Sequence, residues 1–167
     1  YVMSKSLDFA VAMEQAIAGK LQAFGVGCSV ELTALLERVT RSQQAFVQLL
    51  SEASCAEHAA KEPEFDVAAM IGSDAEWAAI TSRFQPGTAP AAIDIAALWS
   101  VYSMLDKMAQ YYLQAAKQVD SPQQRLLFSS LAEIKQKLRR RVGAVEQIQA
   151  NQVWKQVGFP PGLLGKE

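Results

Sequence analysis

Four long stretches of this chain repeat apolar residues every three or four positions, which is the spacing of one face of an α-helix. They cover residues 4–24, 29 to about 60, 91 to the turn at 119–122, and from that turn to about 152. The repeating residues are Leu7, Val11, Ile17, Leu21 and Phe24; Leu32, Leu35, Leu36, Val39, Phe46, Val47 and Leu50; Leu98, Tyr102, Leu105, Ala109 and Tyr112; and Leu127, Leu131, Leu138, Val142, Val145 and Ile148. Because strand signals are nearly absent, this periodicity predicts an all-α fold.

The ends of these stretches carry helix start and stop signals. Ser29 is a predicted N-cap, and Asp120 or Ser121 precedes Pro122 at a first helical position. The segment 61–90 contains "KEPEFD", "IGSD" and "QPGTAP" around one short helix predicted near 75–84, and the tail 153–167 is expected to be irregular. We therefore expect a single domain, 1–167, with helical hairpins at about 4–60 and 91–152 and a long crossover between helices two and three. This is the connectivity of a ferritin-like up-down four-helix bundle.

Composition narrows the classes of partner. The chain has 167 residues, half of them apolar, and a net charge of −1, which gives no general attraction for nucleic acid or an anionic membrane. Cys28 and Cys55 form no CxxC pair, so we expect reduced thiols rather than a zinc ribbon or a disulfide scaffold. No apolar run is long enough to span a bilayer, and the start lacks a signal-peptide core, so we expect a soluble, cytoplasmic protein. Met3 has the character of a natural start, which would leave Tyr1 and Val2 as non-native residues.

The C-terminal half carries a family resemblance. The stretch "LDKMAQYYLQAAKQVDSPQQRLLFSSLAEIKQKLRRRV" has an aromatic pair (111–112), an alanine pair (115–116), a "DSP" turn and "LA" (131–132) in the frame of the last hairpin of rubrerythrins. "AMEQAIAGKLQAF" and "LLERVTRSQQAFVQLL" resemble the first hairpin more loosely. The chain thus resembles the rubrerythrin-like branch of the ferritin-like superfamily over about four-fifths of its length.

That resemblance implies six positions for di-iron ligands, which in such bundles are two single Glu residues and two Glu-x-x-His motifs. Carried onto this chain, these ligand positions are occupied by Glu14, Leu105, Thr40, Gln43, Lys135 and Leu138. Only Glu14 keeps the residue type that the family uses. The chain therefore resembles a degenerate member that has lost most of its ligands, and no cofactor is expected.

Two charged residues stand in apolar stripes. Glu14 lies between Val11 and Ile17, and Lys135 lies between Leu131 and Leu138. Because a lone buried carboxylate is costly, one hypothesis is a buried Glu14–Lys135 ion pair in the position of the metal site. In a second reading, both side chains reach water along their flexible stems. In a third, Glu14 is protonated or bonded to Gln43, Thr40 or Tyr102.

Other features are more typical of ordinary surface and packing. His58, the single histidine, lies among Glu57, Glu62, Glu64 and Asp66, which fits a solvated helix end better than a surface metal site. The run "KQKLRRR" (135–141) fits a solvated helix better than a nucleic-acid site, since no aromatic residues are interleaved. Packing roles are expected for Trp77, Trp99 and Trp154, and a dimer surface for Trp154 with Phe159.

From the sequence we therefore expect a non-catalytic bundle with a structural or interaction role, acting as a homodimer or with a further protein partner, and without membrane or nucleic-acid binding. The first alternative is an oxidoreductase or peroxidase of the rubrerythrin type, in which iron is held by regrouped acids such as Glu14, Glu37, Asp106 and Glu133. The second alternative is a small-molecule or nucleic-acid binding module.

Overall fold

The computed structural model describes residues 2–55, 65–84 and 90–158, and every regular element in these ranges is a helix. The elements are α1 (Val2–Phe24), α2 (Val30–Cys55), α3 (Val67–Ile71), α4 (Asp74–Ser82), α5 (Ala92–Gln118) and α6 (Pro122–Gln156). The all-α prediction is confirmed.

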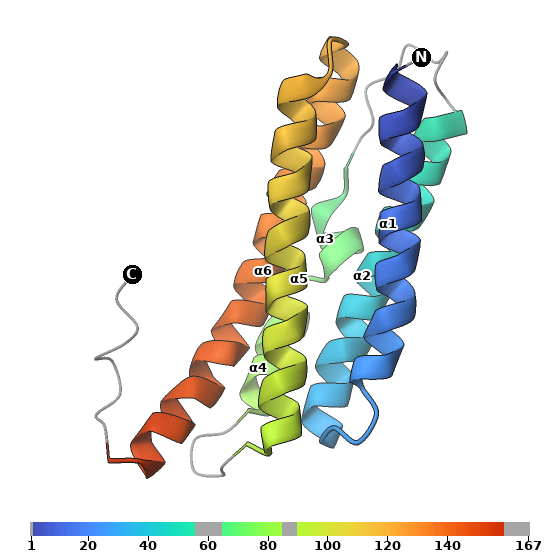
Figure 1. Ribbon diagram of the computed structural model, residues 1–167. Coiled ribbons are helices and arrows are strands. Elements are labelled where there is room, and N and C mark those ends of the chain that lie inside the picture. The colour runs from blue at the N-terminus through green and yellow to red at the C-terminus, as the bar shows by residue number, and fades with distance from the viewer. Residues whose placement is uncertain (1, 56–64, 85–89, 159–167) are drawn as a thin grey trace.

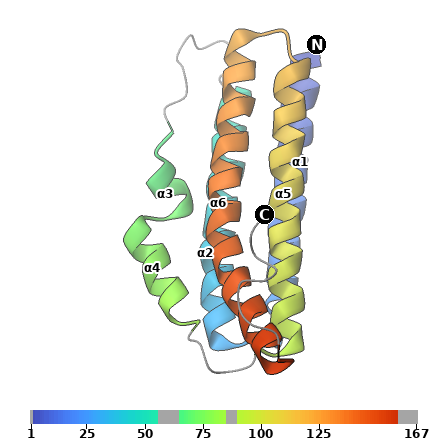
Figure 2. The same ribbon diagram turned by 90° about the vertical axis from the view of Figure 1, so that its left-hand side faces the viewer.

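Four long helices lie side by side, and α3 and α4 lie outside them (Figures 1 and 2). α1 and α2 form one antiparallel hairpin, and α5 and α6 form the other. α2 ends and α5 begins at opposite ends of the molecule, so the two helices point in the same direction (Figure 1). Between them in the chain, α3 and α4 lie against α2 and α6.

The helix ends follow the predicted capping signals. The Ser29 hydroxyl accepts a hydrogen bond from the Leu32 amide at the start of α2, and the Ser121 side chain caps α6, with Pro122 in its first turn. The Ser29 amide donates to the buried carboxylate of Asp94, 3.0 Å away at the start of α5. This bond joins the two hairpins at one end of the molecule.

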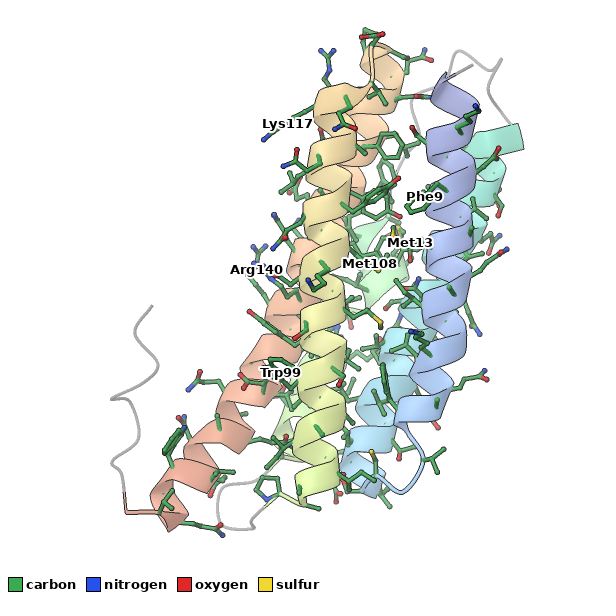
Figure 3. All side chains as sticks on the ribbon, in the orientation of Figure 1. Phe9, Met13, Trp99, Met108, Lys117 and Arg140 are labelled. Carbon is green, nitrogen blue, oxygen red and sulfur yellow. The ribbon has the colours of Figure 1, made fainter. Side chains whose placement is uncertain are left out.

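The apolar face of each long helix contributes to one continuous core, whose side chains fill the space between the ribbons (Figure 3). Phe46, Leu98, Tyr112, Leu131 and Leu138 are among its fully buried members. Five residues predicted on these faces are only partly buried: Val11, Phe24, Val47, Tyr102 and Ile148. These five sit at the borders of the buried stripes.

The crossover contains one more helix than predicted. α4 lies within two residues of the expected piece, but α3 was missed because five residues are too few to show a period. Its start is marked by Asp66, whose side chain accepts the Ala69 amide. The indole of Trp77 is buried and donates to the Ile71 carbonyl at 2.6 Å, which holds α3 and α4 together.

Three further expectations need correction or fall outside the described ranges. α6 continues to Gln156, so Trp154 belongs to the helix and not to an irregular tail. Trp99 is 62% exposed and has no packing role in the core. The predicted end of the second helix near 60, His58 and Phe159 all lie outside the described residues.

Candidate functional site

The centre of the four long helices holds a buried cluster of polar side chains. Glu14 of α1 is fully buried, one turn from Ala10 and Ile17 of the apolar stripe. Its Oε1 accepts a hydrogen bond from the Tyr112 hydroxyl at 2.6 Å. Its Oε2 accepts one from Lys135 Nζ at 3.0 Å and another from Gln43 Nε2. The carboxylate is therefore paired with a cation and bonded on both oxygens.

Lys135 of α6 is also fully buried, and its ammonium group has three partners. Nζ lies 3.0 Å from Glu14 Oε2, 3.0 Å from Gln43 Oε1 and 3.7 Å from the centroid of the Phe46 ring. An ammonium group has three N–H bonds to donate. One carboxylate oxygen, one amide oxygen and one aromatic face therefore match the number of its donors. Burial lowers the pKa of Lys135, and the neighbouring Glu14 carboxylate works against that shift.

Each of the four long helices supplies one member of this cluster, which we call the central cluster: Glu14, Gln43, Tyr112 and Lys135. Gln43 of α2 also donates to the main-chain oxygen of Glu14 at 2.9 Å. Tyr112 of α5 reaches across from the other hairpin. No side-chain nitrogen or oxygen of the central cluster is buried without a hydrogen-bond partner. The cluster therefore links all four helices through satisfied polar contacts.

The six positions implied by the family resemblance fall into two groups. Glu14, Gln43 and Lys135 are in mutual contact. Leu105 and Leu138 are buried in the apolar core, and the Thr40 hydroxyl donates to the Leu36 carbonyl of its own helix at 2.8 Å.

Of the three readings of Glu14 and Lys135, escape to water is wrong, because both side chains are 0% exposed. The two residues are in ion-pair contact, and Gln43 is a further partner of Glu14, whereas Thr40 and Tyr102 are not. Tyr112 was missed as a partner. The available signal was a tyrosine in an apolar stripe, since a buried phenol needs a partner for its hydroxyl.

The acids of the oxidoreductase alternative do not gather around Glu14. Asp106 pairs with Arg139, Glu133 pairs with Lys137, and Glu37 is exposed on α2. Within residues 2–55, 65–84 and 90–158, no three His, Cys, Asp or Glu side chains come together in a way that could hold a metal ion.

Two further features are the environment of the Cys28 thiol and the apolar character of the long helices. The Cys28 thiol donates a hydrogen bond to the Phe24 carbonyl. Burial raises the pKa of this thiol, and the neighbouring Asp94 carboxylate adds to the shift, so the thiol is less reactive. In the part of the chain that the structure describes, no helix combines the length and apolar character needed to cross a membrane.

Comparisons of the chain with protein-family models, with curated proteins and with solved structures found no match.

The ion pair leads to a first prediction. Replacing Lys135 by Met strands a buried carboxylate and should lower the free energy of unfolding by about 3–5 kcal/mol, measured by urea denaturation. Lys137, whose pair with Glu133 is largely exposed, provides the control. Its replacement by Met should cost less than about 0.5 kcal/mol.

A fourfold apolar variant separates the pair from the packing around it. It combines the substitutions Glu14→Leu, Gln43→Leu, Tyr112→Phe and Lys135→Met. Because every charge and hydrogen-bonding group of the central cluster is then removed together, stability should return to within about 2 kcal/mol of the parent. A Lys135→Met variant as stable as the Lys137→Met control would contradict the ion pair.

Tyr112 gives a second prediction, on alkaline pH. Burial, with the nearby Glu14 carboxylate, raises the pKa of Tyr112 well above its ordinary value of 10.0. Above that pH the unfolded chain loses the phenol proton while the folded chain keeps it, so stability falls as pH rises. The lowered pKa of Lys135 acts oppositely, because the folded chain there binds fewer protons than the unfolded one. Tyr112→Phe removes only the first effect and should flatten the alkaline fall, as followed by urea denaturation across this pH range.

At neutral pH the same variant removes a donor from Glu14 and should cost about 1–3 kcal/mol. Tyr111 is the matched control, since its ring packs on Phe9 and Tyr112 at the edge of the core. Tyr111→Phe should cost less than about 0.5 kcal/mol at neutral pH. If the two variants lost equal free energy of unfolding, the hydrogen bond of the Tyr112 hydroxyl to Glu14 would be contradicted.

Proposed function

We propose that this chain is a ferritin-like four-helix bundle of the rubrerythrin type in which an internal ion pair stands where related bundles hold two iron ions. Its role is then structural or interaction-based rather than catalytic. The observation that carries this proposal is the position of Lys135 Nζ, which lies 3.0 Å from both Glu14 Oε2 and Gln43 Oε1. The antiparallel hairpins and the crossover that makes α2 and α5 parallel support the bundle type (Figure 1).

The residues at the family's ligand positions do not fit a di-iron centre. Two hard cations need several anionic oxygen ligands, and imidazoles complete the set. Glu14 is the one carboxylate at these positions, and both of its oxygens are occupied by protein donors. Leu105 and Leu138 offer no donor atom, and Lys135 brings a positive charge into the space.

The chemistry of the central cluster supports a non-catalytic role. The central cluster contains no pair of groups arranged to exchange a proton with a substrate, because each of its polar atoms is buried and bonded to another member. The cluster joins the four helices in one register along the bundle axis. Contacts with other molecules would then be made by the surface of the bundle. Fold and site are separable in such bundles, since apolar packing alone can support the helices.

A third prediction tests this proposal by metal analysis. Protein expressed with added iron, and never exposed to a chelator, should contain far less than one iron per chain by plasma mass spectrometry, with helical circular dichroism intact. About two irons per chain would restore the oxidoreductase alternative.

A fourth prediction concerns self-association. We propose that the chain forms a homodimer, because Trp99 and Trp154 are 62% and 39% exposed and large exposed apolar side chains favour protein contacts. Light scattering should give twice the monomer mass, and Trp99→Ser should shift the equilibrium toward monomer. Trp77 is buried and unsuitable as a control, whereas Val26→Ser, at an exposed turn, should leave the mass unchanged. A monomeric parent protein would contradict the dimer.

A further inference from the structure

A groove with a volume of about 900 Å³ lies between α6 and the α3–α4 pair. Its apolar lining comes from both sides: Val67, Ile71 and Ala75 from the crossover, and Ala144 from α6. In Figure 2, α3 and α4 are seen beside α6, with the outer surface of α6 toward the viewer. Grooves of this size accept several side chains of a bound segment.

The α6 wall of this groove is cationic. Lys137, Arg140 and Arg141 line it together with Ala144, at positions three and four apart that share one helical face. Arg140 is exposed and projects outward from α6 (Figure 3). Among the described residues, three cations line the groove against one acid, Asp74, which pairs with Arg141. Lys137 also pairs with Glu133 of its own helix, which lies outside the lining.

The α3–α4 wall of the groove is fixed to α2 and also contacts α6. α3 and α4 are fixed to α2 by the buried Arg38, which donates to the Met70 carbonyl at 3.1 Å and pairs with Glu76 at 3.3 Å. Arg41 adds a second bond to Glu76 at 3.1 Å. On the α6 side, the partner of Arg141 is Asp74, whose side chain is 93% exposed. The α6 wall is accessible, because the side chains of Lys137 and Arg141 are 41% and 37% exposed and Arg140 is exposed.

We propose that this groove binds an acidic peptide segment of a partner protein, with carboxylates on the α6 cations and an aliphatic side chain on the apolar floor. Charge complementarity favours this occupant, since the cationic wall is local while the whole chain carries a net charge of −1. Nucleic acid fits less well: the described lining has no aromatic ring on which a base could stack, and its floor is apolar. The inference rests on the interaction role proposed above and gives that role a partner chemistry.

Fluorescence anisotropy with the full chain tests the groove. The probe is a short labelled peptide in which Glu pairs alternate with single Leu residues, and its partner probe carries Gln at every Glu position. The Glu peptide should bind, with an affinity that falls as salt is raised, and the Gln peptide should bind about tenfold more weakly or not at all. Equal binding of the two peptides would overturn the proposal.

Variants locate the binding. Lys137→Gln combined with Arg140→Gln should weaken binding of the Glu peptide about tenfold, because two cations are lost. Ala144→Trp, an exposed position, should block the apolar floor without changing charge. Asp74→Asn should strengthen binding by releasing Arg141. The control is Lys20→Gln with Lys107→Gln, two exposed lysines on α1 and α5, which should have no effect.

Other outcomes would overturn the groove as a peptide site. These are no binding of the Glu peptide, binding that the control variant weakens as much as the α6 variant, or tight groove-dependent binding of oligothymidylate in its place. Stoichiometric iron in the same preparation would contradict the metal-free centre and leave the peptide result intact. The two proposals therefore fail separately.

Discussion

The buried carboxylate of Glu14 is the constraint on which the arrangement of the four long helices depends. A carboxylate without exposure is tolerated only when a cation and hydrogen-bond donors surround it. Here the cation comes from α6, one donor from α2 and another from α5. Sliding any one of these helices by one turn would move the side chain that it supplies to the cluster by about 5.4 Å. The Glu14 carboxylate would then lose a bonding partner. The cluster thus specifies the register of the helices more than it adds net stability, because a well-packed apolar centre would be of similar stability.

The same pairing supports the proposal that the centre of the bundle holds no metal ion. The ammonium of Lys135 neutralises the Glu14 carboxylate, and Leu105 and Leu138 are buried in the apolar core. Outside the core, charged side chains make the main polar contacts between α2, α6 and the crossover helices. There Arg38 fastens the crossover to α2, and the α6 cations line a groove that the crossover leaves accessible. The central cluster therefore bears on the register of the helices, and the proposed partner contacts lie outside it.

The long helices could be predicted because their apolar residues recur over about four to six turns. Ser29 and Ser121 mark helix starts with side chains that cap them. Glu14 and Lys135 were identifiable because each interrupts an apolar stripe with a charge. Tyr112 was not, since the spacing rules treat tyrosine as apolar and do not say which acid lies opposite it. α3 is too short for periodicity, and the contact of Arg38 with Met70 joins segments that no local pattern relates. Trp99 was misplaced because its size suggested burial, while its position on α5 faces away from the core.

The most direct test of the central claim is a crystal structure of the protein grown with ferrous iron, with anomalous diffraction recorded at the iron edge. The account predicts density for Lys135 Nζ in hydrogen-bond contact with Glu14 and Gln43, and no anomalous peak at the centre of the helices. An iron peak beside Glu14, with the Lys135 side chain turned away, would contradict it.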